Sequence, residues 1–110
     1  MKTTIEMTLQ AAEDFRGIKD YISKTLHNPQ AAIRLIKLFN TEIHKTLSTF
    51  PESNKIRDEL PELQQRGYRI LYIKNFSIFY RYEKNINTVF IETAQYNKRK
   101  IRKEMFHFDT

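Results

Sequence analysis

Cationic and tyrosine side chains gather in the second half of this chain of 110 residues. The set comprises Arg66, Arg69, Tyr72, Arg81, Tyr82, Tyr96, Lys98 and Arg99. Arginine offers a planar fork for phosphate, and tyrosine can stack on a base or transfer a proton. One metal-free route to RNA cleavage needs only such groups: a base that activates the ribose hydroxyl, cations that stabilise the phosphate, and an acid for the leaving oxygen. The alternative is structural, because tyrosines that alternate on strands commonly pack in the core and arginines between them face solvent.

The C-terminal residues add a concentrated positive charge. Between Tyr96 and Thr110 there are five cations and two acids, so this stretch carries +3 of the net charge of +6. The cations are Lys98, Arg99, Lys100, Arg102 and Lys103. Such a cluster predicts an acidic partner: nucleic acid, an acidic protein segment or a membrane surface. A solvated helix with Ile101, Met105 and Phe108 on its buried side explains the same residues equally well.

Composition predicts one globular domain that spans residues 1–110. Hydrophobic residues make up 40% of the chain and charged residues 29%, which is the balance of a folded protein and not of a disordered one. Cysteine is absent, so disulfides and thiolate chemistry are excluded. No signal-peptide pattern and no apolar run of about 18 residues occurs, which predicts a cytoplasmic protein that does not enter a membrane.

Familiar catalytic and cofactor motifs are missing. The chain has no GxGxxG, Walker, HExxH or GxSxG pattern, so dinucleotide binding, P-loop hydrolysis, zinc proteolysis and elbow-type hydrolysis lose their usual support. His27, His44 and His107 are far apart and have no carboxylates at the spacing of metal ligands. We therefore expect neither a metal nor a cofactor. The adjacent acids Glu13–Asp14 and Asp58–Glu59 are interpreted as solvated charge.

The N-terminal part of the chain predicts a strand followed by a helix. Residues 4–9 alternate apolar and polar, which is typical of a half-buried strand. The apolar side of this strand is formed by Ile5, Met7 and Leu9. From Gln10 to Leu26 the apolar residues recur at steps of three and four, which predicts a helix with one apolar stripe. Gly17 inside this helix is interpreted as a site of close packing.

A second helix and a polar segment follow. Asn28 can cap a helix and Pro29 suits its first turn, so a helix is predicted from Pro29 to Thr49, ending before Pro51. Because only about two residues separate the helices, they must fold back on one another as an antiparallel hairpin. Residues 52–65 are polar and without a clear period, and are predicted to be mainly loop.

Three strand-like runs complete the fold. Residues 67–73, 76–82 and 88–96 are rich in tyrosine, phenylalanine, isoleucine and valine and are joined by short polar breaks. Such runs predict an antiparallel meander. The predicted class is therefore α+β with the order β-α-α-β-β-β, in which the helical hairpin packs on one face of a small twisted antiparallel sheet.

Taken in order, these features resemble toxins of the RelE/ParE superfamily, the stable halves of bacterial type II toxin–antitoxin modules. The matching residues are Thr8, Ala11, Asp14-Phe15, Ile18, Tyr21-Ile22, Asn28-Pro29, Ala31-Ala32, Leu47, Pro51, Gly67-Tyr68-Arg69, Lys74-Asn75-Phe76, Ile78-Phe79-Tyr80 and Lys98-Arg99. The resemblance implies a cognate antitoxin as partner. It also implies one of two targets: DNA gyrase, which ParE-like toxins poison, or mRNA on the ribosome, which RelE-like toxins cut. A non-toxic nucleic-acid-binding protein is a third reading.

The resemblance favours a ParE-like toxin that acts on DNA gyrase, or an inhibitor of another target that is likewise not a nuclease. It places the strand arginine of RelE-like toxins at Ser77, where this chain has no cation, and Asn97 cannot act as a general acid. If the chain does cut RNA, the expected catalytic residues are Arg69 or Arg81 for phosphate, Tyr96 as proton shuttle, and Lys98 and Arg99 for transition-state charge. In either branch the expected target-binding residues are Lys98, Arg99, Lys100 and Arg102.

Overall fold

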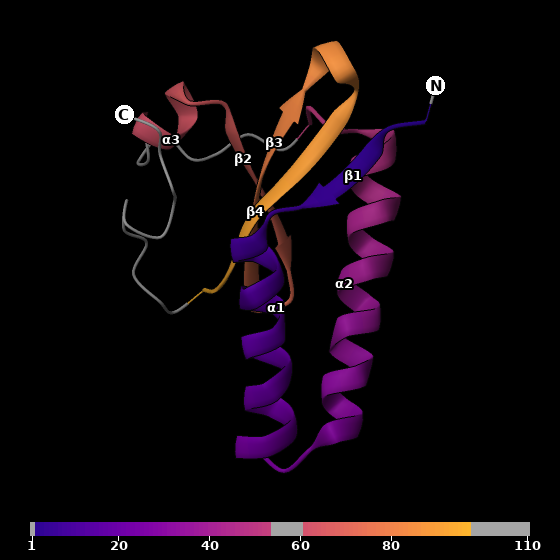
Figure 1. Ribbon diagram of the computed structural model, residues 1–110, viewed down its shortest axis with the longest axis vertical. Helices are drawn as coiled ribbons and strands as arrows, with labels where there is room; N and C mark the ends of the chain where they lie inside the picture. Colours follow the sequence, from indigo (N-terminus) through magenta and orange to yellow (C-terminus); the bar gives the residue numbers. More distant parts are fainter. Residues whose placement is uncertain (1, 54–60, 98–110) are drawn as a thin grey trace.

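The computed structural model describes residues 2–53 and 61–97. The elements in chain order are β1 (Thr4–Met7), α1 (Leu9–Asp20), the π-helical turn η1 (Tyr21–Thr25), α2 (Pro29–Thr49), α3 (Pro61–Gln65), β2 (Tyr68–Ile73), β3 (Phe76–Glu83), the 3-10 turn η2 (Lys84–Ile86) and β4 (Thr88–Tyr96). The helices α1 and α2 run side by side and extend beyond the end of the sheet (Figure 1). The predicted α+β class with a helical hairpin on a small sheet is confirmed.

The four strands form one sheet in the order β1-β4-β3-β2. The meander β2-β3-β4 is antiparallel, as predicted, whereas β1 runs parallel to β4 and makes the sheet mixed. Sequence gives no signal for this pairing, because β1 reaches the free edge of β4 only after the chain has passed through both helices and the meander. A register shift between Phe79 and Tyr80 leaves Glu92 as an extra residue on β4.

The first strand is shorter than predicted because Thr8 starts the helix. The Thr8 side chain accepts from the Ala11 amide at 3.1 Å, which caps α1, and donates to the Glu92 carbonyl at 3.0 Å. The predicted apolar side of the strand is correspondingly wrong in part. Ile5 is half-buried, but Met7 and Leu9 are 45% and 77% exposed.

The first helix changes its winding before it ends. Its α-helical part stops at Asp20 and η1 follows, with the Leu26 amide donating to the Tyr21 carbonyl at 3.0 Å. His27 then adopts a φ of 52° and turns the chain into the second helix. That helix, α2, has the predicted bounds, and the Asn28 side chain caps it by accepting from the Ala31 amide at 3.2 Å.

The predicted loop contains a short helix. Within residues 52–65, α3 forms where Leu63 packs against the sheet and is only 5% exposed, so tertiary burial outweighs the polar composition. Gly67 follows with a φ of +81°, a conformation that favours glycine, and leads into β2. Residues 54–60 of the predicted loop lie outside the described residues.

The core lies between the helices and one face of the sheet. Phe39 of α2 is its centre: the ring lies 5.1 Å from that of Phe15 on α1 and 5.4 Å from that of Phe76 on β3. The core cluster also includes Leu47, Ile78, Tyr80, Val89 and Ile91, each fully buried. This packing fixes how α1 sits relative to the ends of β3 and β4 and so positions the groups described below.

Two negative findings concern the part of the chain that the structure describes. None of its helices is both long and apolar enough to cross a lipid bilayer. Its histidine, aspartate and glutamate side chains nowhere form a group of three or more that could hold a metal ion.

Candidate functional site

Arg81 is bound by side chains of its own chain. Its Nε donates to Glu92 Oε1 at 2.7 Å, one terminal nitrogen donates to Glu83 Oε1 at 2.7 Å, and the guanidinium lies 5.3 Å from the centre of the Phe90 ring. Burial by itself lowers the pKa of Arg81, but the hydrogen bond and the charge of Glu92 outweigh it, with smaller contributions from Tyr68 and Glu83, so its pKa is raised. Glu92 is the extra residue of the bulge in β4, so the bulge directs a carboxylate at this cation.

Arg69 and Arg81 lie on opposite faces of the sheet. Arg69 pairs with Tyr80, a core residue beneath the helices, while Arg81 pairs with Tyr68 and Phe90 on the face away from them. The guanidinium of Arg69 donates to the backbone carbonyl of Glu52. A phosphate held by one of these arginines would therefore be separated from the other by the sheet.

Tyr96 lies at the far end of the sheet from Arg69. It pairs with Phe76, their ring centres are 5.6 Å apart, and Phe76 in turn pairs with Ile73. Ile73 is four residues beyond Arg69 on β2, which is about 13 Å along a strand. Tyr96 is 43% exposed. Neither of the two alternative arginines, Arg69 and Arg81, is therefore brought together with Tyr96.

Ser77 and Asn97 stand at the positions that the resemblance compares with functional residues of RelE-like toxins. The two contact each other through uncharged side chains. Ser77 Oγ donates to Asn97 Oδ1, and the Asn97 amide donates to the Asn75 carbonyl at 2.8 Å. Ser77 is buried, beside the equally buried Gln95 with which it pairs. Neither Ser77 nor Asn97 supplies a charge at this place. The remaining predicted site residues, Lys98, Arg99, Lys100 and Arg102, lie outside the described residues.

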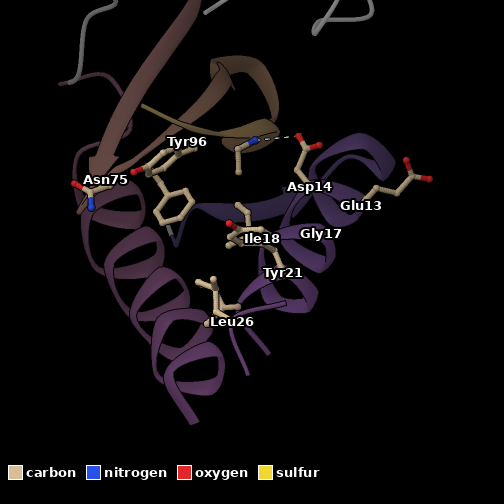
Figure 2. A pocket seen from close by; sticks show the side chains of 11 residues that line it. Glu13, Asp14, Gly17, Ile18, Tyr21, Leu26, Asn75 and Tyr96 are labelled. Carbon is tan, nitrogen blue, oxygen red and sulfur yellow. Dashed lines mark hydrogen bonds between the residues drawn. The ribbon is translucent and has the colours of Figure 1, made fainter. Parts of the chain in front are cut away.

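A pocket of about 670 Å³ lies between α1 and the end of the sheet (Figure 2). Its walls come from α1 and η1, from the turn between β2 and β3, and from the last residues of β4. The residues that line it are Glu13, Asp14, Gly17, Ile18, Tyr21, Ile22, Leu26, Asn75, Phe76, Ala94 and Tyr96. Among the predicted site residues that the structure describes, only Tyr96 lines it. Tyr21 and Leu26 are 56% and 54% exposed, so the apolar surface continues from the pocket onto the outside of the protein.

Asp14 links α1 to β4 through hydrogen bonds, so its interpretation as solvated charge is wrong. One carboxylate oxygen accepts from the Ala94 amide at 3.1 Å and from the Thr93 hydroxyl, and the other accepts from the Gln10 side chain at 2.8 Å. The Ala94 amide lies on the edge of β4 beyond the end of β1, so Asp14 takes the place that a further strand residue would have. Its neighbour Glu13 is exposed and projects from the rim of the pocket (Figure 2).

Sequence reasoning missed this pocket because its residues are mostly apolar and are dispersed along the chain. The interpretation of Gly17 as a close-packing site is wrong, since a Cβ built on it would meet no atom within 4 Å. Leu26 was placed on the buried stripe of the helix and is exposed instead. The one available signal was the glycine itself, which is unfavourable in a helix and needs a reason.

The helical hairpin on a four-stranded sheet is a fold that this chain shares with several solved structures. The structure of a chromosomal ParDE toxin–antitoxin system from P. aeruginosa matches with a TM-score of 0.67 and 22% identity, over 86% of this chain and 95% of that one. The RelBE2 toxin–antitoxin complex from Mycobacterium tuberculosis matches with a TM-score of 0.56 and 18% identity, over 87% and 99%. The free toxin RelE of E. coli, as a double mutant, matches with a TM-score of 0.50 and 14% identity, over 87% and 84%.

Residues 5–94 match the model of the ParE toxin of the type II toxin–antitoxin system parDE. The chain therefore belongs to the ParE toxin family, within the RelE/ParE superfamily of type II toxins. Membership of this family implies a cognate antitoxin as partner. A comparison with curated protein sequences finds no match.

Proposed function

We propose that this chain inhibits bacterial growth by binding and poisoning a macromolecular target, with DNA gyrase as the leading candidate, and that it does not cut RNA. The family match supports the ParE-like branch. The observation that carries the proposal is that neither of the alternative phosphate residues lies with Tyr96. Arg69 is about 13 Å away along the strands, and Arg81 is on the opposite face of the sheet.

Metal-free cleavage of RNA needs a base, an acid and cations within hydrogen-bond reach of one phosphate. Arg81 is instead neutralised by Glu92 and Glu83, and binding a phosphate there would require these carboxylates to move away. Tyr96 faces the pocket beside α1 and not either arginine. A toxin that only binds its target needs no such convergence.

The proposed target-binding group is the basic cluster of Lys98, Arg99, Lys100 and Arg102, which follows directly on the last strand in sequence. Its charge suits an acidic surface on the target or the DNA that the target holds. The same net positive charge would raise the rate of encounter with an acidic macromolecule.

The test is induction of the chain in a bacterial host, with mRNA cleavage and double-strand DNA breaks measured in the same cells. We expect growth arrest with trapped DNA breaks and no ribosome-dependent cuts. Reversing two charges, Lys98→Glu with Arg99→Glu, should abolish the arrest, whereas Lys19→Glu with Lys24→Glu on the first helix matches the charge change away from the cluster. Co-expression of the antitoxin should restore growth.

The two other readings give different results in that experiment. Ribosome-dependent mRNA cuts without DNA breaks would establish the RelE-like branch and overturn the proposal. A chain that is harmless when it accumulates in folded form would support the non-toxic nucleic-acid-binding protein.

A further inference from the structure

The exposed side of α2 carries a row of polar and cationic residues. The members of the row are all exposed and recur at steps of four, three, four and four: Gln30, Arg34, Lys37, Thr41 and Lys45. Each member stands two positions before a residue of the core-facing stripe that runs from Ala32 to Leu47. Two positions turn an α-helix by about 200°. The row, which we call the outer face of α2, therefore points away from the core between the helices and the sheet (Figure 1).

The outer face of α2 has three cations and no acid. Among the described residues, Arg34, Lys37 and Lys45 form no ion pair, whereas Arg81 is bound by two carboxylates. Glu42, the acidic residue of this helix, is half-buried and stands outside the row. Arg34 and Lys37 are three residues apart, and like charges that are neighbours on a helix repel one another. The arrangement therefore weakens the helix slightly and leaves its positive charge available to a partner.

The first helix arranges the same residue types differently. Arg16 and Lys19 on α1 have the same identities and spacing as the first two cations of the outer face of α2, and they are likewise exposed. Glu13 stands three positions before Arg16, and Asp20 stands four positions after it. A helix face that only keeps a protein soluble typically mixes the two signs of charge in this way. The outer face of α2 departs from that pattern.

The residue types of the outer face of α2 suit phosphate better than a protein surface. Side-chain contacts to nucleic-acid phosphates come from arginine and lysine and from serine, threonine, asparagine and glutamine. Gln30 and Thr41 complete this set beside the three cations. The centre of a protein–protein interface is instead depleted of charge and rich in large apolar side chains. The exposed Ile33 of the same helix stands outside the row, which contains no apolar residue.

The spacing of the cations indicates the form of the nucleic acid. Lys37 and Lys45 are eight residues apart, which is about 12 Å along the helix at 1.5 Å per residue. The major groove of B-form DNA is also about 12 Å wide, so cations on the two sides of Thr41 can reach phosphates of both strands. Duplex RNA does not offer this spacing, because the major groove of its A-form helix is deep and narrow.

We infer that the outer face of α2 binds double-stranded DNA by lying across its major groove. Arg34 and Lys37 bind phosphates of one strand, Lys45 binds a phosphate of the other strand, and Thr41 lies over the groove between them. The contacts go to the DNA backbone, so the binding has no sequence preference. The inference goes beyond the proposed function, which assigns target binding to the basic cluster after β4 and does not require the helices to contact DNA.

The experiment is fluorescence anisotropy of a labelled DNA duplex, titrated with the purified chain at several salt concentrations. The logarithm of the affinity for B-form DNA falls with the logarithm of the salt concentration by a slope of about 0.9 for each phosphate contact. Arg34→Gln with Lys37→Gln should therefore reduce this slope by about two and weaken binding roughly tenfold or more at low salt. Glutamine forms helices about as well as arginine and lysine do, so the helix is retained.

A matched control lies on the other long helix. Arg16→Gln with Lys19→Gln removes the same residue types at the same spacing from α1. It should leave the slope unchanged and weaken binding by less than about threefold, because a distant exposed charge is screened by salt. Thermal unfolding of each free variant checks that the fold is retained. Equal losses in the two double variants would show that only the net charge matters, and would overturn the inference.

A single substitution tests the placement across the groove. Lys45→Gln should reduce the slope by about one, because one phosphate contact on the second strand is lost. An unchanged slope in a folded Lys45→Gln chain would overturn this placement.

Other polyanions and the basic cluster after β4 provide two further tests. Binding of polyglutamate or duplex RNA as tightly as duplex DNA would overturn the choice of DNA as partner. A slope that falls in Lys98→Gln with Arg99→Gln, and not in Arg34→Gln with Lys37→Gln, would assign the DNA contact to the cluster instead of α2. Growth arrest does not enter these measurements, so a failure of the proposed function and a failure of this inference are separate results.

Discussion

The cluster around Arg81 and the pocket around Gly17 are built from opposite kinds of residue. Arg81 is the type of side chain that binds phosphate, yet two of its nitrogens already donate to Glu92 and Glu83, and its guanidinium lies over the Phe90 ring. The pocket is lined mostly by apolar groups, and in the described part of the chain no neighbouring atom lies within 4 Å of a Cβ built on its glycine. Arg81, whose side chain is suited to catalysis, thus stabilises the sheet, whereas the apolar surface of the pocket is left exposed.

This difference shows how structural residues can be told apart from binding residues in a small basic protein. An exposed charge is common in such a chain and is readily paired with another charge at little net energy. An unfilled apolar pocket is less common in a monomer, because apolar surface left in water gives up about 25 cal/mol for each Å² that could be buried. Burial and pairing are therefore better guides to the binding surface than residue type.

The largest effect is expected at Asp14, which lines the pocket but is used by the fold. Asp14→Ala leaves the Ala94 amide and the Thr93 hydroxyl without their partner, and should lower the free energy of unfolding by about 2 kcal/mol. Urea unfolding measures this. The adjacent Glu13→Ala should change stability by less than about 0.5 kcal/mol. Equal effects of the two substitutions would contradict the distinction drawn between these neighbouring carboxylates.

A smaller loss is expected at Arg81. Arg81→Met keeps the length of the side chain and removes its charge, so Glu92, whose side chain is 17% exposed, loses its partner. The free energy of unfolding should fall by about 1 kcal/mol, since the pair is partly exposed and screened by solvent. Toxicity at equal protein level should persist. A folded Arg81→Met chain that no longer arrests growth would show that the arginine acts on the target and does not serve the sheet alone.

The smallest effect, of opposite sign, is expected at Gly17. Gly17→Ala should raise the free energy of unfolding by about 0.5–1 kcal/mol, because alanine favours the helix and no neighbouring atom meets its methyl group. Gly67→Ala is the contrasting control, and should destabilise by roughly 1 kcal/mol because its φ is +81°. Both are read from thermal unfolding. A loss of stability in Gly17→Ala would show that the open space is needed by the fold itself.

Much of the architecture could be predicted from local patterns. The second helix has its predicted bounds because Asn28 and Pro29 start it and a regular apolar stripe sustains it to Thr49. The three runs of aromatic and branched residues became the antiparallel meander for the same local reason. The parallel pairing of β1 and the helix α3 had no local signal, since each depends on burial against elements that are distant in sequence.

The candidate site was predicted less well, and Arg69 and Arg81 show why. Both were chosen by residue type, and strand alternation alone does not reveal that their neighbours in the sheet place them on opposite faces. The sequence pattern around Asp14 predicts solvated charge because its partners at 93 and 94 are about eighty residues away. The predicted cations at 98–102 lie outside the described residues, and their role stays a prediction.

The sequence by itself determined the two long helices, the three extended runs of the meander, the α+β class of the fold and the positive net charge, because periodicity, capping and composition are properties of neighbouring residues. Only the tertiary structure decided that Glu92 neutralises Arg81, that Asp14 bonds to the edge of β4, and that an apolar pocket remains open at Gly17. Each of these depends on the distance between groups far apart in the chain, and packing of the helices on the sheet sets that distance.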